Sequence, residues 1–285
     1  MTGPDPAVPT ASPRQRRRLT LTVGLVLVGL NVAVALLTLV WTPYDPGGMS
    51  GGRLAPPSLA HWAGTDRLGR DFFTEIMIGA RIALIVGIGA VGIGAALGVT
   101  LGVLAAFATR AADDALAATL DILIAFPSLL IAMLVVAASN SASLGSAIVA
   151  LGIALAAVVA RLTRILAKGV LQKDYITAAR VSGTSWPAIV FRHVLPNIWP
   201  TLAVNLALQF GLAVIAEASL SYLGLGAPPP NASWGRLLQE AQGTVYTAPI
   251  GAVAPGIALV LLVIGVNLLA DGLRDVGDPT RRVAR

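Results

Sequence analysis

Six long apolar runs dominate the pattern of hydrophobic and polar positions along the chain. A helix that crosses a bilayer needs about 20 mainly apolar residues. The runs that approach or exceed this length cover residues 19–41, 82–108, 115–138, 144–160, 199–225 and 250–270. They lack the alternation of a membrane-barrel strand, and backbone groups in hydrocarbon must bond within their own segment. The pattern therefore predicts an all-α membrane protein with six transmembrane helices.

Composition supports lipid as the main solvent of the chain. Hydrophobic residues make up 56% of the sequence and charged residues only 12%, whereas a soluble domain carries about 25% charged residues. A soluble protein of this composition would expose large apolar patches and aggregate. The chain has no cysteine, which excludes disulfides, thiolate metal sites and thiol catalysis.

The basic residues indicate how the helices are oriented. The first run follows a basic segment, but its apolar stretch exceeds the 7–15 residues usual in a signal peptide, so we expect an uncleaved anchor. With a cytoplasmic N-terminus, 15 of the 20 Lys and Arg residues fall in the inside segments. This asymmetry predicts that both termini are cytoplasmic. The expected order is a tail at 1–18, a first helix at 19–41, an outer loop at 42–81, a five-helix domain at 82–271 with a cytoplasmic region at 161–196, and a tail at 272–285.

The cytoplasmic region at 161–196 is predicted to contain two short helices separated by Gly183. Gly183 suits the left-handed position that follows a helix, and Ser185 can cap a second helix that starts at Trp186 and Pro187. Around the helix that starts near Asp174, one side carries Lys173, Thr177, Arg180 and Thr184. The other side carries Tyr175, Ala178, Ala179 and Ser182. This spacing predicts an amphipathic surface helix, for which contact with lipid headgroups is the simplest role.

Several motifs in this region and around it resemble a known family. Thr177-Ala178-Ala179, Gly183 and the later Val194-Leu195-Pro196 are similar to the EAA signature in permease subunits of bacterial ATP-binding-cassette importers, with Thr177 in place of the usual Glu. The segments GTDRLGRD, TAARVSG, RHVLPN, EASLSYLGLG, SWG and DGLRDVGDP resemble the second permease subunit of the dipeptide, oligopeptide and nickel branch. The resemblance covers residues 64–279.

The resemblance implies the type I importer permease fold in the bacterial cytoplasmic membrane, with a coupling helix at about 173–186 that docks on an ATPase. It assigns ATPase coupling to Asp174, Thr177, Ala178, Ala179, Arg180, Gly183 and Trp186. The implied partners are a second homologous permease, two ATPase domains or subunits and an extracytoplasmic substrate-binding protein. The implied cargo is a dipeptide or oligopeptide, with nickel or another small solute as the alternative.

ATP and Mg are expected on the partner ATPases rather than on this chain. A phosphate-binding loop needs a Lys followed by Ser or Thr, but Lys168 precedes Gly169 and Lys173 precedes Asp174. We therefore expect no catalytic, cofactor-binding or metal-binding residue here. An ion-coupled secondary transporter is the competing class, and it should show internal repeats and deeply buried carboxylates in several spans. We find no convincing repeat.

Polar residues within the apolar runs are the candidates for a translocation pathway or gate, because such groups are costly in a bilayer. We select Asn205, Gln209 and Glu217. Each has an alternative role: Asn205 and Gln209 in interhelical hydrogen bonds, and Glu217 in a bond to Ser219 or Ser221 near the outer interface. Asp121 near the inner boundary is expected to be structural.

Three further features concern packing and loops. Gly94, Gly98 and Gly102 form a ladder that favours close helix approach. Pro127 should kink the third span. The outer segment GTDRLGRD is expected to form a charge-paired turn, or else a contact for the binding protein.

Overall fold

The computed structural model describes residues 13–139, 143–226, 228 and 231–277. The elements are α1 (Pro13–Leu37), α2 (Phe72–Phe107), α3 (Arg110–Ala125), α4 (Ser128–Ala138), α5 (Leu144–Leu171), α6 (Asp174–Val181), α7 (Trp186–Ile189), the π-helical turn η1 (Val190–Val194), α8 (Leu195–Tyr222), α9 (Trp234–Ala241) and α10 (Ile250–Gly277). No strand forms in these residues, apart from isolated bridges between Met49 and Arg70 and between Thr65 and Asp71.

Five stretches of the described chain are helical, long and apolar enough to cross a membrane, and a bent pair would make a sixth. The bent pair is α3 and α4, whose axes differ by 91°. The span expected at 115–138 is therefore built from two helices, and the predicted kink at Pro127 is confirmed. Proline has no N–H for the helical ladder and disfavours helical geometry at the residue before it. Phe126 accordingly adopts extended backbone angles, φ −79° and ψ 136°.

Several predicted helix ends are also wrong, because an apolar run marks the part of a helix in lipid and not where its hydrogen bonds begin. α2 starts at Phe72 rather than at 82, since the Asp71 carboxylate caps it by accepting from the backbone N–H and the hydroxyl of Thr74, both at 2.8 Å. α5 continues to Leu171 rather than to 160. α1 already begins at Pro13, within the expected tail. Residues 1–12 and 278–285 of the expected tails lie outside the described residues.

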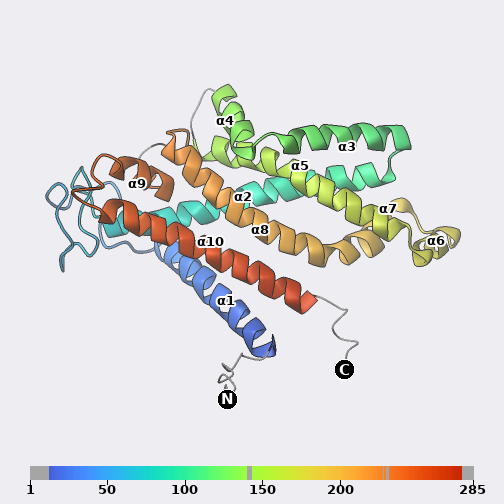
Figure 1. Cartoon of the computed structure of the whole chain (residues 1–285), viewed down its shortest axis with the longest axis horizontal. Helices are drawn as coiled ribbons and strands as arrows, with labels where there is room; N and C mark the ends of the chain where they lie inside the picture. Colours follow the sequence, from blue (N-terminus) through green and yellow to red (C-terminus); the bar gives the residue numbers. More distant parts are fainter. Residues whose placement is uncertain (1–12, 140–142, 227, 229–230, 278–285) are drawn as a thin grey trace, which may run out of the picture.

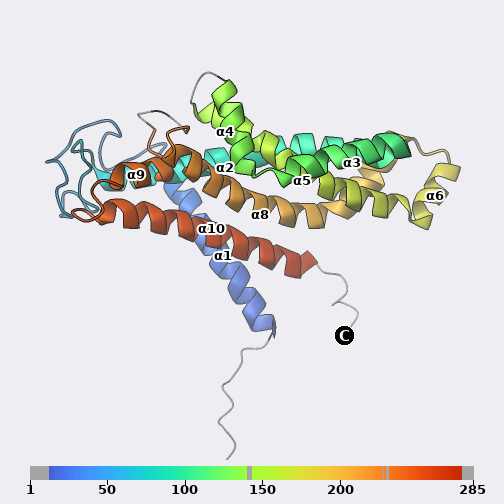
Figure 2. The same cartoon turned by 45° about the horizontal axis from the view of Figure 1, so that its top comes forward.

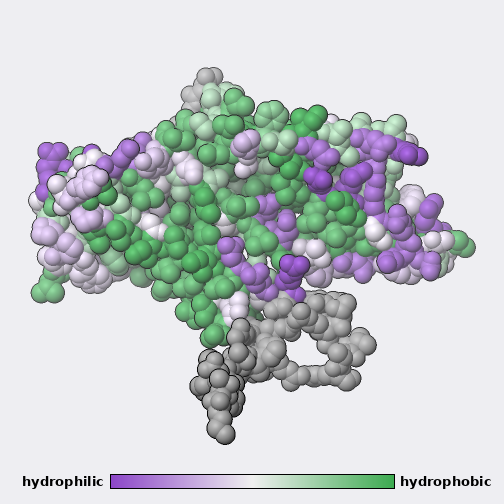
Figure 3. Space-filling view, in the orientation of Figure 1, coloured by the Kyte–Doolittle hydropathy of each residue, from purple (hydrophilic) through white to green (hydrophobic). Residues whose placement is uncertain are grey.

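The helices form an elongated bundle with two distinct ends (Figure 1). The α9 end gathers the loop at 38–71, helix α9 and the segment leading to α10. The α6 end gathers the α2–α3 turn, α6 and α7. α1 crosses α10 obliquely, and α4 projects from the opposite side of the bundle (Figure 2). On the face shown in Figure 3, the surface between the ends is mostly apolar and hydrophilic residues gather towards both ends, as expected for a bundle that spans a bilayer.

The glycine ladder of α2 lies directly against α5. A Cβ atom at Gly94 would lie 3.0 Å from Leu155 Cβ, one at Gly98 2.6 Å from Val159 Cβ, and one at Gly102 2.5 Å from the Ala160 carbonyl oxygen. The predicted packing role of the ladder is confirmed. Because apolar burial gives little preference for helix contacts over lipid contacts in a bilayer, close backbone approach of this kind provides the dispersion contacts that hold two helices together.

We expect Gly98→Val to destabilise the bundle, because the added side chain collides with α5. Overpacking of this kind costs about 1–3 kcal/mol. Gly92→Val is the matched control, since it adds the same side chain to the same helix where no atom lies within 4 Å. Thermal unfolding of the purified protein in mild detergent should show a lower midpoint for Gly98→Val than for Gly92→Val. Equal midpoints would show that the ladder is not under packing constraint.

Candidate functional site: the coupling surface and the α8 ridge

Helix α6 is held to the bundle by one buried side chain. Ile176 is only 1% exposed and belongs to a small apolar cluster at the α6 end. The other buried members of that cluster are Ala167 of α5, Ile189 of α7, Val194 of η1 and Ile198 of α8. The cluster therefore connects α6 to the ends of both long helices that flank it.

The turn after α6 has the geometry predicted from Gly183. Gly183 adopts φ +81°, its N–H donates to the Arg180 carbonyl at 3.0 Å, and the Thr184 N–H donates to the Ala179 carbonyl at 3.0 Å. These two bonds define a Schellman motif, which satisfies carbonyls that the helix end leaves open. Ser185 is the N-cap residue of α7, as predicted, but its side chain makes no capping hydrogen bond.

The faces of α6 differ from the predicted division. Tyr175, Ala178 and Ser182 were expected on the side opposite the polar residues, yet all three are exposed, as most of the polar residues are. The two short helices predicted on either side of Gly183 are confirmed, but the coupling helix implied at about 173–186 is shorter, because α6 ends at Val181. Periodicity failed here because the helix has only eight residues and a single strongly buried position. The coupling surface, which we define as Asp174, Thr177, Ala178, Arg180, Val181 and Gly183, is exposed throughout.

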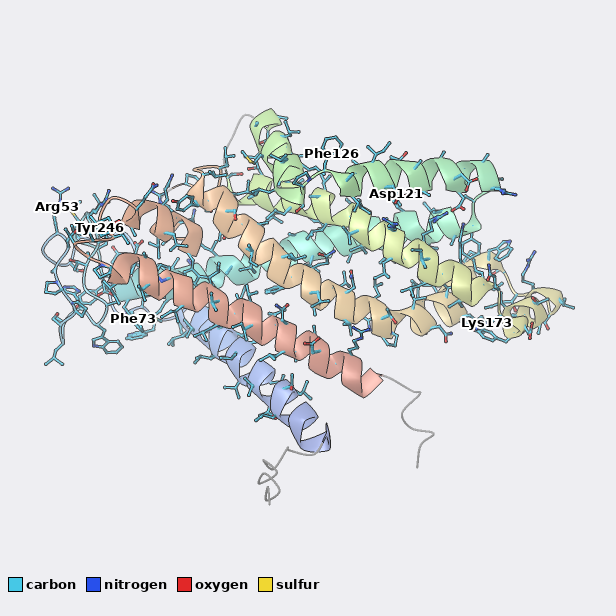
Figure 4. The ribbon with its side chains drawn as sticks, viewed as in Figure 1. Arg53, Phe73, Asp121, Phe126, Lys173 and Tyr246 are labelled. Atoms are coloured by element: carbon cyan, nitrogen blue, oxygen red, sulfur yellow. The ribbon has the colours of Figure 1, made fainter. Side chains whose placement is uncertain are left out.

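Trp186 and Arg180 form the edge of the coupling surface that faces the bundle. The Arg180 guanidinium lies 4.4 Å from the centre of the Trp186 ring, and Trp186 meets Phe107 of α2 edge to face at 5.0 Å. These residues line a cavity of about 490 Å³ between α6 and the ends of α2 and α5. Of the predicted coupling residues, only Ala179 is partly covered rather than exposed. Figure 4 shows Lys173, just before α6, far from Arg53 and Tyr246 at the α9 end.

The three candidate pathway residues lie on one ridge of α8 at four-residue spacing. This α8 ridge comprises Asn205, Gln209, Ala213, Glu217 and Ser221. Gln209, Glu217 and Ser221 are 4%, 2% and 3% exposed. The exposed side of α8 instead carries Leu208, Leu212 and Ile215. The α8 ridge therefore faces the interior of this subunit, and a pathway role for its polar residues stays a prediction.

Glu217 has a partner within its own helix. The Ser221 hydroxyl donates to the Glu217 carboxylate at 2.6 Å, so the alternative bond to Ser221 is confirmed. Next to this pair, Gly235 of α9 would place a Cβ only 2.0 Å from the Ala218 carbonyl oxygen. Asn205 differs, because its side-chain amide oxygen, Oδ1, is buried and has no hydrogen-bond partner.

The α9 end is organised around Arg70 and Trp234. The Arg70 guanidinium meets Asp66 at 2.6 Å, Glu75 at 3.2 Å and Glu240 at 3.4 Å. Burial alone would lower the pKa of Arg70, but the Glu75 and Asp66 carboxylates outweigh it and raise that pKa above its ordinary value. The predicted charge-paired turn in GTDRLGRD is therefore confirmed.

Trp234 explains the SWG motif. Its side chain is 2% exposed, and its indole N–H donates to the Ile76 carbonyl at 3.0 Å. A Cβ at Gly79 would lie 2.3 Å from the indole ring. The Ser233 side chain caps α9 by accepting from the Arg236 N–H. The motif thus wedges α9 between α2 and α8.

Two ion-pair contacts at the α6 half of the bundle were missed or only partly foreseen. Asp113 of α3 accepts from Arg164 of α5 at 2.5 and 2.8 Å and also pairs with Lys168. The sequence contains a signal for it, since two cations one helical turn apart favour a carboxylate between them. Asp121, for which we expected a structural role, pairs with Arg161 at 3.1 Å.

Long helices apolar enough to cross a membrane define a multi-pass membrane protein. Residues 98–283 match the family described as "Binding-protein-dependent transport system inner membrane component". The chain belongs to this family, as the EAA-like motif suggested, and is a transport permease.

Curated relatives extend this likeness over nearly the whole chain. The chain is 40% identical over 284 residues to a putative peptide transport system permease protein of Brucella suis, covering 99% of this chain and 94% of that protein. It is 40% identical over 266 residues to a glutathione transport system permease protein of Pectobacterium atrosepticum, covering 93% and 88%. It is 37% identical over 259 residues to a dipeptide transport system permease protein of Alkalihalophilus pseudofirmus, covering 90% and 84%.

We expect Glu217→Leu to destabilise the protein and Glu217→Gln to leave its stability almost unchanged. Gln keeps the shape and can still accept from Ser221, whereas Leu removes that acceptor. A buried polar group that loses its partner costs about 1–3 kcal/mol. Thermal unfolding in detergent measures both variants against the unmodified protein. A large loss of stability with Gln would mean that the charge of Glu217 itself is required.

Proposed function

We propose that this chain is the permease subunit of an ATP-binding-cassette importer that carries dipeptides or oligopeptides. Family membership and the names of relatives for peptide, dipeptide and glutathione transport support this cargo class. The chain forms the translocation pathway together with a second homologous permease. A substrate-binding protein delivers cargo from outside, and two ATPase domains or subunits bind ATP and Mg and supply the energy.

One structural observation carries the coupling part of this proposal. The coupling surface projects from the α6 end on a helix whose one buried side chain is Ile176, and the Schellman turn at Gly183 fixes its far end. A short, rigid helix with small and polar exposed residues suits a groove on an ATPase. The cluster around Ile176 joins this helix to α5 and α8, so a displacement of α6 reaches two spans.

The proposal fixes the orientation of the chain in the membrane. The ATPases are cytoplasmic, so the α6 end faces the cytoplasm and the α9 end faces outward. The charge asymmetry supports this, because the tails and the region at 161–196 hold most of the basic residues. Both termini then lie in the cytoplasm, with the α3–α4 pair counted as one span.

The α8 ridge remains our candidate for a gate. Gln209 and Glu217 are buried and Asn205 is partly buried in this conformation, so all three would contact cargo fully only after α8 separates from its neighbours. Its unpartnered Asn205 oxygen is the group that gains most from such an opening, since exposure to water would satisfy it.

Cysteine labelling tests the orientation, because the native chain has no thiol. We expect a membrane-impermeant maleimide to leave Thr10→Cys unlabelled in intact cells and to label it after permeabilisation. Met49→Cys is the matched control, since Met49 is 77% exposed in the loop at the α9 end and should react in intact cells. The opposite labelling pattern would overturn the orientation.

Gly183→Leu tests the coupling proposal. The left-handed conformation at φ +81° costs a residue with a side chain roughly 1–2 kcal/mol, and no atom within 4 Å of the new Cβ obstructs it. The transmembrane bundle should therefore persist, while uptake of a labelled dipeptide and cargo-stimulated ATP hydrolysis fall several-fold.

Two variants serve as controls for Gly183→Leu. Gly169→Leu adds the same side chain in α5, also in open space but in helical geometry, and should transport normally. Gly183→Asn keeps a residue that tolerates left-handed angles and should retain more uptake than Leu. Normal uptake by Gly183→Leu at unchanged protein level would remove the coupling assignment.

A further inference from the structure

A partly buried ion cluster connects the beginning of α3 to the last turns of α5. The Asp113 carboxylate accepts hydrogen bonds from Nε and Nη2 of Arg164, at 2.5 and 2.8 Å. It also pairs with the Lys168 ammonium. The Asp113 side chain is 8% exposed and that of Arg164 is 17% exposed. Bidentate contact between a guanidinium and a carboxylate is a strong and directional arrangement. We name these three residues the Asp113 clamp.

The Asp113 clamp lies at the end of a packed interface between α3 and α5. Leu120 of α3 is buried against Ala157 and Ala160 of α5, with Leu116 beside it. Asp113 continues this stripe of α3 at helical spacing. A Cβ at Gly102 of α2 would lie 2.5 Å from the carbonyl oxygen of the same Ala160. The clamp thus completes a compact junction of α2, α3 and α5.

The junction of α2, α3 and α5 lies close to the start of α6 along the chain, so it can transmit a movement of α6. Lys168 lies in the last turn of α5, which ends at Leu171, and α6 begins at Asp174. At its other end α3 leads directly into the 91° bend before α4. Ion pairs therefore attach α3 to α5, the helix that precedes the coupling helix α6. The chain itself connects α3 to α4, the other half of the bent span.

The charges around the clamp distinguish it from ordinary surface ion pairs. Arg164 and Lys168 are like charges one turn apart, which repel each other on a helix, and Asp113 removes that repulsion. The adjacent Asp114 pairs with Arg110 only at 4.0 Å, and both side chains are largely exposed. Asp121 and Arg161 form a second α3–α5 pair, but each is about half exposed. Asp113 is thus the one acidic side chain of α3 that is buried against α5.

We propose that the Asp113 clamp positions α3 so that it moves together with α5 and the coupling helix, and so conveys the ATPase stroke to the bent α3–α4 span. This inference rests on the proposed coupling function. Asp113, Arg164 and Lys168 act as positioning residues, because they contact neither cargo nor nucleotide. Loss of the clamp leaves the ATPase able to move α6 while α3 follows only partly, so ATP is hydrolysed without matching transport.

The test compares Asp113→Asn with the matched control Asp114→Asn in the complete complex, reconstituted with its ATPases, partner permease and binding protein in liposomes. The readout is the number of labelled dipeptide molecules transported per ATP hydrolysed. Coupling between sites commonly amounts to about fivefold or more, so Asp113→Asn should lower this ratio by about fivefold. Asp114→Asn should leave it unchanged. A purely structural defect would lower transport and hydrolysis together, in proportion to the assembled complex, and would not move the ratio.

A charge swap keeps the test decisive if Asp113→Asn assembles poorly. Asp113→Arg alone gathers three cations and should be the most damaging variant. Adding Arg164→Asp again puts one carboxylate between two cations, with Lys168 one turn away, and should restore much of the ratio. An unchanged ratio for Asp113→Asn, or a swap that assembles without recovery, would overturn the clamp. Failure of the ATPases to assemble with the unmodified chain would instead overturn the proposed function.

Discussion

The absence of water in the bilayer core is the constraint on which the rest of this structure depends. Every backbone N–H and C=O group in hydrocarbon must find a partner in its own segment, so the spanning segments are helical. The same solvent removes most of the hydrophobic gain from joining helices, and contact has to come from close approach of backbones. Gly98 and Gly102 of α2 allow that approach to α5, and Gly265 of α10, whose Cβ would lie 2.8 Å from Leu27 Cβ, allows it to α1.

Outside the apolar band the fold is held by different forces. At the α9 end, one guanidinium is surrounded by carboxylates, and an indole is wedged into the bundle and hydrogen-bonded to a backbone carbonyl. At the α6 end, Ile176 and its cluster provide a small apolar contact, and the Asp113 clamp provides a charged one. Ion pairs thus lie towards the two ends, where water can compete, and the middle of the bundle depends on the close packing of apolar side chains and backbones.

The sequence predicts best those features that a few neighbouring residues determine. Pro127 breaks its helix and Gly183 ends α6 because each acts through its own backbone geometry. The apolar runs locate the spans for the same reason. The start of α2 at Phe72 is harder to predict from the sequence, because it depends on a hydrogen bond from Thr74 to the Asp71 side chain.

Features that depend on distant residues are much harder to predict from the sequence. Burial of Ile176 results from its contact with residues of α5, η1 and α8, so the periodicity of a short helix could not identify the inward face. The partner of Asp113 lies 51 residues away in the sequence. Likewise, the interior position of Glu217 is set by helices that pack around α8, and an isolated carboxylate in an apolar run is equally compatible with a pathway.

The anchoring of α6 by one side chain constrains the length of the segment that contains it. Each residue added to a helix turns everything beyond it by about 100° and advances it by about 1.5 Å. One insertion or deletion between Leu171 and Ile176 would rotate that side chain away from its cluster, and one between Ile176 and Gly183 would turn the exposed residues relative to the bundle. In working proteins of this kind we therefore expect the interval from Leu171 to Trp186 to keep a fixed number of residues, while the loop at 38–71 can gain or lose several.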